Sequence, residues 1–286
     1  MGRFSDVLLV SDFDRTLTRN DSTIPQQNLD AIAYFMKEGG IFTIATGRSL
    51  PLFRQRAEGL PLKVPVLLYN GAACYDFGAQ KLEFCIAMPD ELPQIMGQIM
   101  RRYPELRAEV QCLDAHYCFG RDALRDEYLA KSGVTVHYRP WSELPKPWVK
   151  ASFYAPFHKA GHCLPWEATE EEDRLFSQLC QWVNERYKGA YTATQALPRM
   201  MELERYGVSK GTGARKLANT LGRSILVCAG DAPNDLTMLE EAEYGYVPAD
   251  CDTKIRGRGF LTAASCDEGA IADIVAQLEK TLSEKE

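Results

Sequence analysis

Several patterns that mark other classes of protein are missing from this sequence. The N-terminal segment, MGRFSDVLLVSDFD, contains an apolar run that is too short for a membrane span or for the core of a signal peptide. No basic stripe is present, and 33 Lys and Arg residues against 39 Asp and Glu residues give a net charge of −6. Polyphosphates repel a surface with such an excess of negative charge. We therefore expect neither nucleic acid nor a membrane as a partner.

The cysteines lack the pattern of a disulfide framework or of a zinc site. Their number is odd, no two form a CxxC pair, and they are scattered singly along the chain. His158 and His162 are four residues apart, but neighbouring prolines argue against the helix that a zinc-binding pair of this spacing needs. We expect reduced, mostly buried thiols, and hence a cytoplasmic protein. The nine cysteines are Cys74, Cys85, Cys112, Cys118, Cys163, Cys180, Cys228, Cys251 and Cys266.

What the sequence does contain is an alternation of short apolar segments with helical patterns. The expected strands are residues 7–12, 41–46, 64–71 and 224–231, and the expected helices are residues 25–40, 209–222 and 265–282. Ser265 and Glu268 fit a capping box at the start of the last helix. Uniformly apolar strands separated by helices predict an α/β fold, a doubly wound parallel sheet that is covered on both faces.

The middle of the chain has a different pattern. It mixes stretches that contain Pro, Trp and His with strand-like pieces and one clear helical pattern at residues 170–187. We interpret this region as a second domain, of the α+β type, inserted into the first. The expected domains are a core of residues 1–82 and 206–286, and an inserted domain of residues 83–205.

Two carboxylates stand at the end of the first expected strand, in SDFDRTLT (residues 11–18). Asp12 and Asp14 are two residues apart, so an extended backbone directs both side chains the same way. Two anions about 4 Å apart repel by roughly 1–4 kcal/mol at the usual effective dielectric constants, so a cation or a proton has to offset them. A divalent cation beside Asp12 and a protonated Asp14 meet both needs, although acidic residues are also common in solvated turns.

Two weaker signals occur elsewhere in the expected core. In IATGRS (residues 44–49), Thr46 offers a hydroxyl group and Gly47 lets an anionic oxygen approach the backbone amides closely. In GVSKGTG (residues 207–213), Lys210 lies at the expected start of a helix. A positive charge there opposes the helix dipole unless an anion lies in front of it. A plain turn and a surface lysine are the alternative interpretations.

A fourth segment, AGDAPNDLTML (residues 229–239), follows the expected strand that ends near residue 231. Asp231, Asn234 and Asp235 place three oxygen-bearing side chains at the carboxyl end of that strand, where ligands bind in open α/β sheets. Carboxylate and amide oxygens are the ligands that magnesium prefers. A role as helix N-cap explains one of these residues, but not all three.

Together, and in this order, the four segments resemble the haloacid dehalogenase (HAD) superfamily of aspartate-nucleophile phosphatases, most closely its Cof-like sugar-phosphatase branch. The matching motifs are DxDxT, TGR, a lysine and GDxxND, and they run through the whole expected core. The resemblance implies a Rossmann-like HAD core that carries the site. It also implies a large α+β cap that is inserted in the long stretch between Thr46 and Lys210 and that determines substrate specificity.

The resemblance further implies a role for each matching residue. Asp12 is the nucleophile, Asp14 is the general acid and base, and Lys210 neutralises Asp12 and the transferred phosphoryl group. The implied phosphate-binding set is Thr46, Gly47, Lys210 and Asn234. The implied ligands of Mg²⁺ are Asp12, the main-chain carbonyl of Asp14, and Asp231, with Asp235 at the ion or next to it. Candidate substrate contacts are Arg48 and Asn70.

Two positions depart from the pattern of this family. Arg15 stands where the family usually has glycine, and three interpretations are open: contact with a substrate phosphate, pairing with an acidic neighbour, or a tolerated substitution in a turn. VPADCD (residues 247–252) lacks the Asn-Ala pair that is common in this branch. A contact made by that pair is therefore not expected here.

These observations predict a Mg²⁺-dependent phosphatase that hydrolyses a small phosphorylated metabolite, such as a sugar phosphate, through an aspartyl-phosphate. One alternative is a phosphomutase, which retains a phosphoryl group and needs a bisphosphate activator. The other is a binding protein without catalysis. The complete acid set argues against the second alternative, because a binding protein has no need of Asp14.

Overall fold

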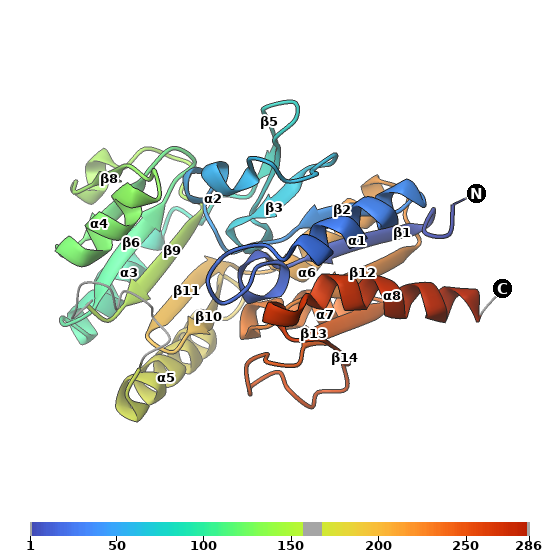
Figure 1. Ribbon diagram of the computed structural model, residues 1–286. Helices are drawn as coiled ribbons and strands as arrows, with labels where there is room; N and C mark the ends of the chain where they lie inside the picture. Colours follow the sequence, from blue (N-terminus) through green and yellow to red (C-terminus); the bar gives the residue numbers. More distant parts are fainter. Residues whose placement is uncertain (1, 157–167, 285–286) are drawn as a thin grey trace. The chain divides into compact units, whose positions relative to one another are not determined.

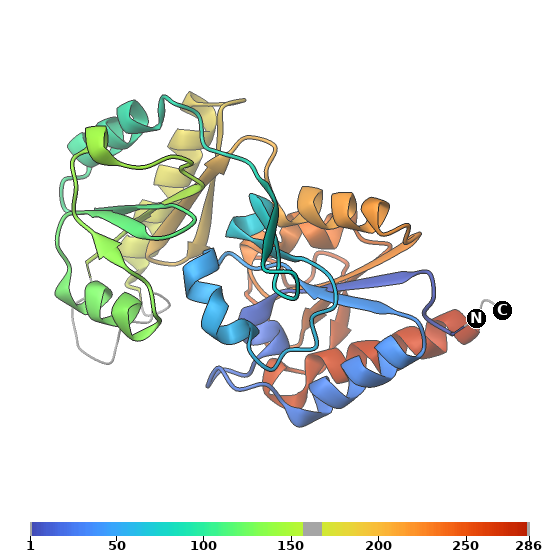
Figure 2. The same cartoon turned by 90° about the horizontal axis from the view of Figure 1, so that it is seen from above.

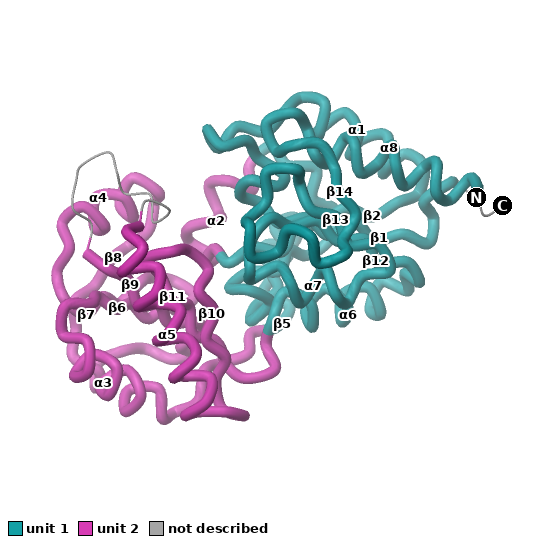
Figure 3. Tube along the Cα trace, turned by 90° about the horizontal axis from the view of Figure 1, so that it is seen from below, with its two compact units in different colours: residues 1–47, 59–84, 209–286 teal, residues 48–58, 85–208 magenta. Residues whose placement is uncertain are grey.

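The computed structural model describes residues 2–156 and 168–284, and the chain forms two compact units (Figure 3). The first unit consists of Met1–Gly47, Gly59–Phe84 and Ser209–Glu286, and the second consists of Arg48–Glu58 and Cys85–Val208. The chain thus passes between the units four times. His158, His162 and Cys163 lie outside the described residues.

The first unit is built on a parallel sheet whose strand order is β14-β13-β12-β1-β2. The strands are β1 (Val7–Ser11), β2 (Ile41–Ile44), β12 (Ile225–Ala229), β13 (Tyr244–Pro248) and β14 (Leu261–Ala263). The central strands β1 and β12 are almost completely buried, as expected for apolar segments with helices on both sides. The prediction of an α/β fold with a parallel sheet is confirmed.

Helices cover both faces of this sheet (Figures 1 and 2). α1 (Gln26–Lys37) and α8 (Ala270–Ser283) pack side by side on one face. α6 (Lys210–Thr220) and α7 (Leu236–Glu241) pack on the other, where their buried apolar residues join those of β1 and β12 in one core. The sheet is therefore fixed from both sides, and its strand ends form a rigid edge.

The start of the last helix differs from the prediction. α8 begins at Ala270, after a 3-10 turn (Cys266–Glu268) and Gly269, whose φ of 86° interrupts the helix. Ser265 donates its hydroxyl to Glu268 at 2.7 Å, and no side-chain hydrogen bond caps the turn. The predicted capping box is wrong, because the two side chains pair with each other.

The predicted strand at residues 64–71 also ends early. β3 (Val66–Leu68) stops where Tyr69 and Asn70 adopt positive φ angles of 52° and 55°, which a strand does not contain. β3 continues through a 3-10 turn into β4 (Ala73–Asp76), which pairs with it in the antiparallel direction. The three-stranded sheet β3-β4-β5 is completed by β5 (Lys81–Cys85).

The second unit contains a six-stranded sheet of order β10-β11-β9-β6-β7-β8, antiparallel except for the β7–β8 pair. Its strands are β6 (Arg107–Gln111), β7 (His116–Phe119), β8 (Val136–His137), β9 (Lys150–Tyr154), β10 (Tyr191–Leu197) and β11 (Met200–Arg205). Its helices are α2 (Leu50–Ala57), α3 (Leu92–Arg102), α4 (Ala123–Lys131) and α5 (Glu170–Arg186). The predicted helix at residues 170–187 is confirmed.

Residues 48–58 group with this second unit, although the prediction placed them in the core of residues 1–82. α2 starts at Ser49, whose hydroxyl accepts a hydrogen bond from the Leu52 amide at 3.3 Å. The same hydroxyl lies 2.7 Å from Nε2 of His116 on β7, so it ties α2 to the sheet. That residues 83–205 act as a cap which reads substrate stays a prediction.

The two faces of the six-stranded sheet carry different side chains. Alternate residues of β6, β9 and β11 pack into an apolar core with α3 and α5. On the opposite face, Glu109, Ser152 and Glu202 lie at matching positions of neighbouring strands, and all three are buried. Glu109 accepts a hydrogen bond from Arg125 at 2.9 Å, and Glu202 pairs with Lys150. The second unit therefore depends on buried ion pairs as well as on its apolar core.

We expect Glu109→Gln to destabilise the second unit by about 3–5 kcal/mol at pH 7, the usual effect of removing one partner of a buried ion pair. Burial raises the pKa of Glu109, but Arg125 and His116 outweigh burial and hold it below 4.5. Such a carboxylate stabilises the fold above its ordinary pKa, and this contribution is lost as the pH falls toward the lowered pKa.

The measurement is urea unfolding followed by tryptophan fluorescence, since all four tryptophans fall within residues 85–208 of the sequence. The difference between wild type and Glu109→Gln should shrink between pH 7 and pH 3. The control is Glu105→Gln, which alters an exposed carboxylate two residues before the same strand. An equal loss in both variants, or a loss that does not depend on pH, contradicts the role of the ion pair.

Among the residues that the structure describes, no helix has both the length and the apolar character needed to span a membrane.

Candidate active site

The strand order of the first unit brings the predicted site residues to one edge of the sheet. β1 lies between β12 and β2, and Asp12 follows the last residue of β1. The Asp12 amide donates a hydrogen bond to the carbonyl of Ala229, the last residue of β12, at 2.8 Å. Asp231 follows Ala229 by two residues. Asp12 and Asp231 therefore both lie just beyond the carboxyl ends of two adjacent strands, β1 and β12.

Three carboxylates meet at this edge. One carboxylate oxygen each from Asp12, Asp231 and Asp235 lies within 4.8 Å of the others. All three residues are buried, with exposed fractions of 6%, 4% and 0% respectively. Lys210 Nζ donates hydrogen bonds to Asp12 Oδ1 and to Asp235 Oδ1, both at 2.6 Å. The structure therefore brings together four of the residues that the motifs singled out.

Asp235 is held by hydrogen bonds on both of its carboxylate oxygens. Oδ1 accepts from Lys210, and Oδ2 accepts from the amides of Asp231 and Ala232 at 3.0 and 2.9 Å. A side chain at position 230 would place its Cβ 2.4 Å from the Asp235 side chain. Only glycine therefore lets the backbone run this close to Asp235. Asp235 thus fixes the loop that carries Asp231 and also positions Lys210.

Burial and crowding raise the pKa values of the carboxylates. Burial raises the pKa of Asp12 to about 7; Lys210 opposes this shift, and the charges of Asp235 and Asp14 add to it. Burial, followed by the charges of Asp12 and Asp235, raises the pKa of Asp231 well above its ordinary value. For Lys210, the two carboxylates outweigh burial and raise its pKa, so its charge is retained.

The cluster is short of positive charge, because three carboxylates share one buried ammonium group, Lys210, and one partly exposed guanidinium group, Arg15. A hard divalent cation bound by oxygen ligands would supply the missing charge, and Asp12 and Asp231 offer such ligands. The donor set therefore fits a divalent metal ion.

Lys210 is the first residue of α6, as the sequence predicts. Ser209 caps the helix by accepting a hydrogen bond from the Thr212 amide at 3.1 Å. The charge of Lys210 opposes the helix dipole, but the carboxylates of Asp12 and Asp235 lie in front of it. These carboxylates are the anions that the unfavourable position of the lysine requires.

Asp14 and Arg15 lie in a turn, Phe13–Leu17, that follows Asp12. Asp14 is half-buried and has an extended backbone, with φ −78° and ψ 130°. The negative charge of Asp14 acts on Asp12, since it contributes to the raised pKa of Asp12. Its carboxylate is not part of the group formed by Asp12, Asp231 and Asp235 within the described residues.

The other predicted residues of the first unit form a second polar group. Thr46 is buried after β2; its amide donates to Leu67 O at 2.9 Å, and its carbonyl accepts from the Asn70 amide at 3.0 Å. Asn234 donates a side-chain hydrogen bond to Asn70 Oδ1 at 3.2 Å. Thr46, Asn70 and Asn234 are thus linked, and Gly47 directly follows Thr46. Arg48 belongs to the second unit and is half-buried.

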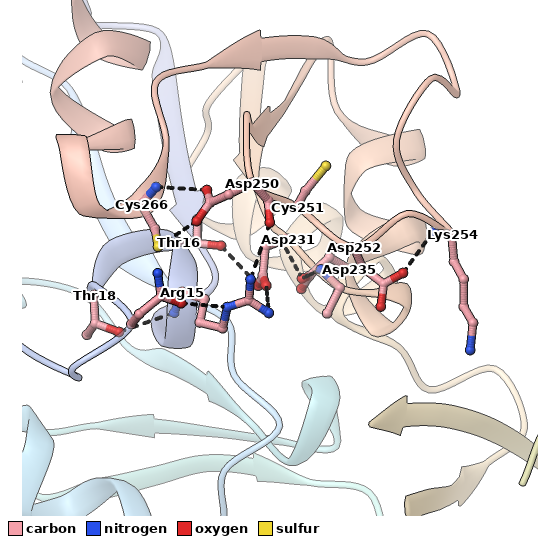
Figure 4. A network of polar contacts seen from close by, with 12 residues as sticks. Arg15, Thr16, Thr18, Asp231, Asp235, Asp250, Cys251, Asp252, Lys254 and Cys266 are labelled. Carbon is pink, nitrogen blue, oxygen red and sulfur yellow. Dashed lines mark hydrogen bonds and ion pairs between the residues drawn. The ribbon is translucent and has the colours of Figure 1, made fainter. Parts of the chain in front are cut away.

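Two contacts of Asp231 were not predicted as part of the site. The Thr16 hydroxyl donates a hydrogen bond to Asp231 Oδ1 at 3.3 Å, and Arg15 Nη1 lies 3.7 Å from Asp231 Oδ2 (Figure 4). The signal for Thr16 was present, since it is the last residue of the DxDxT motif. For Arg15, pairing with an acidic neighbour was one of three open interpretations, and the structure shows that pairing.

Comparison with known proteins identifies the family. A model of haloacid dehalogenase-like hydrolases matches residues 9–275. The 5-amino-6-(5-phospho-D-ribitylamino)uracil phosphatase YcsE of Bacillus subtilis (strain 168) is 21% identical over 271 residues, which cover 92% of each chain. The pyridoxal phosphate phosphatase YbhA of Escherichia coli (strain K12) is 21% identical over 294 residues, which cover 94% of this chain and 97% of YbhA.

Solved structures agree with this relationship. The HAD subclass IIB sugar phosphatase BT4131 is 17% identical and superposes with a TM-score of 0.72, over 94% of this chain and 98% of that one. These matches define the class: the chain is an enzyme, a phosphatase. It belongs to the haloacid dehalogenase-like hydrolase family, among the Cof-like members that the motifs indicated.

Proposed function

We propose that this enzyme is a Mg²⁺-dependent phosphatase that hydrolyses a small phosphorylated metabolite through a phosphoryl-aspartate at Asp12. The observation that carries the proposal is the buried group of Asp12, Asp231 and Asp235 with Lys210 bonded to two of them. A carboxylate next to a buried ammonium group, at the carboxyl end of a central strand, is placed to attack a phosphoryl group.

In the first step, a carboxylate oxygen of Asp12 forms a bond to phosphorus while the bond from phosphorus to the ester oxygen breaks. Asp14 gives a proton to the leaving alkoxide. In the second step, Asp14 takes a proton from a water molecule that attacks the phosphoryl-aspartate, which releases inorganic phosphate and restores Asp12. Lys210 lies 2.6 Å from Asp12 and offsets charge on the transferred group.

The proposed magnesium site uses the carboxylates of Asp12 and Asp231 and the main-chain carbonyl of Asp14. When bound, the ion supplies positive charge that neutralises oxygens of the phosphoryl group. Asp235 supports the site rather than lying at the ion, because both of its oxygens already accept hydrogen bonds from Lys210 and from two amides. Lys210 remains charged next to Asp12, so the nucleophile keeps this cation whether or not the ion is bound.

The proposed phosphate-binding group is Thr46, Gly47 and Asn234, together with Lys210. Thr46 and Asn234 are each linked to Asn70 by a hydrogen bond, which limits the freedom of the loops that carry them. Such preorganised donors act without rearrangement during the reaction. Asn70 and Arg48 are the proposed contacts to the rest of the substrate.

A sugar phosphate or a similar phosphomonoester is the proposed substrate class, and residues 83–205 are proposed as the cap that reads it. Two observations support this class. BT4131 is named as a sugar phosphatase, and YcsE and YbhA are named for small phosphorylated substrates. The net charge of −6 also disfavours polyphosphate partners such as nucleic acid.

The test is a screen of phosphorylated metabolites in which released inorganic phosphate is measured. With Mg²⁺ present, we expect release from at least one sugar phosphate or similar monoester. Excess EDTA should abolish this release, and added Mg²⁺ should restore it, since three carboxylates would otherwise repel the phosphate.

The matched control is Asp12→Asn under the same conditions, which should release no phosphate with or without the ion. Full wild-type activity in excess EDTA would contradict the metal assignment. Isomerisation of a sugar phosphate without release, dependent on a bisphosphate activator, would identify a phosphomutase instead.

A further inference from the structure

Arg15 has a backbone conformation that is unusual for a residue with a side chain. Its φ of 58° and ψ of 13° fall in the left-handed region, where glycine is favoured and other residues are strained. An arginine that is kept in a conformation suited to glycine needs contacts that compensate for the strain.

The guanidinium group of Arg15 makes three such contacts, and Figure 4 shows those with Asp231 and Asp250. Nη1 lies 3.7 Å from Asp231 Oδ2, Nη2 donates a hydrogen bond to the carbonyl of Asp250 at 3.2 Å, and Nε donates to Asn20 Oδ1 at 3.2 Å. Asp231 and Asp250 follow two different strands, β12 and β13. Arg15 therefore joins the loop that carries a site carboxylate to the next loop of the sheet edge.

Arg15 and Lys210 pair with different carboxylates of the site. Lys210 bonds to Asp12 and Asp235, whereas the cation beside Asp231 is Arg15. The remaining Asp231 oxygen accepts a hydrogen bond from the uncharged hydroxyl of Thr16. The Asp231 side chain is 6% exposed and the Arg15 side chain is 37% exposed. A buried carboxylate thus faces the guanidinium group of a partly exposed side chain.

We propose that Arg15 is a positioning residue that acts as a fixed counter-cation for Asp231, stabilising the metal-free site and lowering its affinity for Mg²⁺. This inference rests on the proposed metal site. A divalent ion on Asp231 lies close to the guanidinium group, and like charges at such distances repel. Binding of the ion therefore competes with the Arg15–Asp231 pair, while without the ion the pair offsets the repulsion among the carboxylates.

The first experiment is calorimetric titration of the metal-free full-length protein with MgCl₂, without substrate. We expect Arg15→Gln to bind Mg²⁺ about tenfold more tightly than wild type, the order of effect of removing one nearby charge in a partly solvated site. Arg15→Lys, which keeps the charge, should bind as wild type does. Arg19→Gln is the matched control, since it removes a charge from the same loop, where Arg19 contacts the carbonyl of Asp267.

The second experiment is thermal unfolding of the same proteins in excess EDTA and in excess Mg²⁺. In EDTA, Arg15→Gln should unfold about 2–4 °C below wild type, because Asp231 has lost its counter-cation. Excess Mg²⁺ should reduce or reverse that difference, since the variant binds the ion more tightly. A residue that only filled space would lower the unfolding temperature equally in both conditions.

Unchanged or weaker Mg²⁺ binding by Arg15→Gln overturns the inference, and so does an equal effect of Arg19→Gln. These results leave the proposed phosphatase activity intact, because neither experiment measures turnover. If neither wild type nor Arg15→Gln binds Mg²⁺, both the inference and the metal assignment of the proposed function fail.

Discussion

Replacing Asp12 with Asn is expected to abolish phosphate release with every substrate, because the nucleophile is removed. Replacing Asp14 with Asn is expected to lower turnover by about 10²–10⁴-fold, the usual contribution of general acid–base catalysis. The two variants should differ most with p-nitrophenyl phosphate, whose leaving group needs no proton. With this substrate Asp14→Asn should release a burst of about one nitrophenolate per active site and then stall, because nothing activates water for the second step.

Intact-mass spectrometry after a rapid quench should show the added phosphoryl mass on Asp14→Asn and none on Asp12→Asn. Asp6→Asn is the matched control, since Asp6 is exposed just before the opposite end of β1 and this variant should turn over normally. A burst from Asp12→Asn with an inert Asp14→Asn would reverse the two roles. Hydrolysis by wild type with no labelling of either variant would contradict the covalent mechanism.

Replacing Lys210 with Met is expected to lower turnover by about 10²–10³-fold, the usual loss when one group that stabilises transition-state charge is removed. It should also destabilise the first unit. Lys210 is 1% exposed, and without it Asp12 and Asp235 lose their shared cation. Removing one partner of a buried ion pair costs about 3–5 kcal/mol. Because the charge of Lys210 lowers the pKa of Asp12, the variant should also need a higher pH for activity.

The measurements are a pH–rate profile with excess Mg²⁺ and urea unfolding in EDTA. Lys216→Met on the same helix is the control, because Lys216 is exposed and its ammonium group lies over the ring of Phe84, 4.1 Å from the ring centroid, rather than in the site. The profile of this control should coincide with that of wild type. If Lys210→Met kept the wild-type rate and pH profile, Lys210 would have no part in the reaction.

The sequence predicted the parallel sheet and the four residues of the central group well. Buried strands such as residues 7–12 leave a continuous apolar signal, and chemistry at their carboxyl ends follows from the geometry of parallel sheets. For that reason the sequence alone predicts that Asp12 and Asp231 lie at the same edge of the sheet. Their roles in the reaction stay predictions.

The parts that the sequence did not show depend on side chains that meet across the fold. Ser265 and Glu268 match a capping box, but sequence spacing does not show that their side chains bond to each other. The sequence also gave no signal that α2 joins the second unit, because the Ser49–His116 contact links positions far apart in the chain. The partner of Arg15 stayed open for the same reason, since Asp231 is distant in sequence.

The four passages of the chain between the two units limit how this enzyme can be recombined with its relatives. A fragment of residues 85–208 alone leaves out α2 and with it the Ser49 hydroxyl that lies 2.7 Å from buried His116. It also leaves out Gln55, which lies against Gly133. Because the second unit is proposed to carry the cap, exchanging it for that of another phosphatase requires two donor segments, and the shorter one starts directly after Thr46 and Gly47. A chimaera that exchanges only residues 85–208 would separate α2 from the six-stranded sheet, which it contacts through Ser49 and His116.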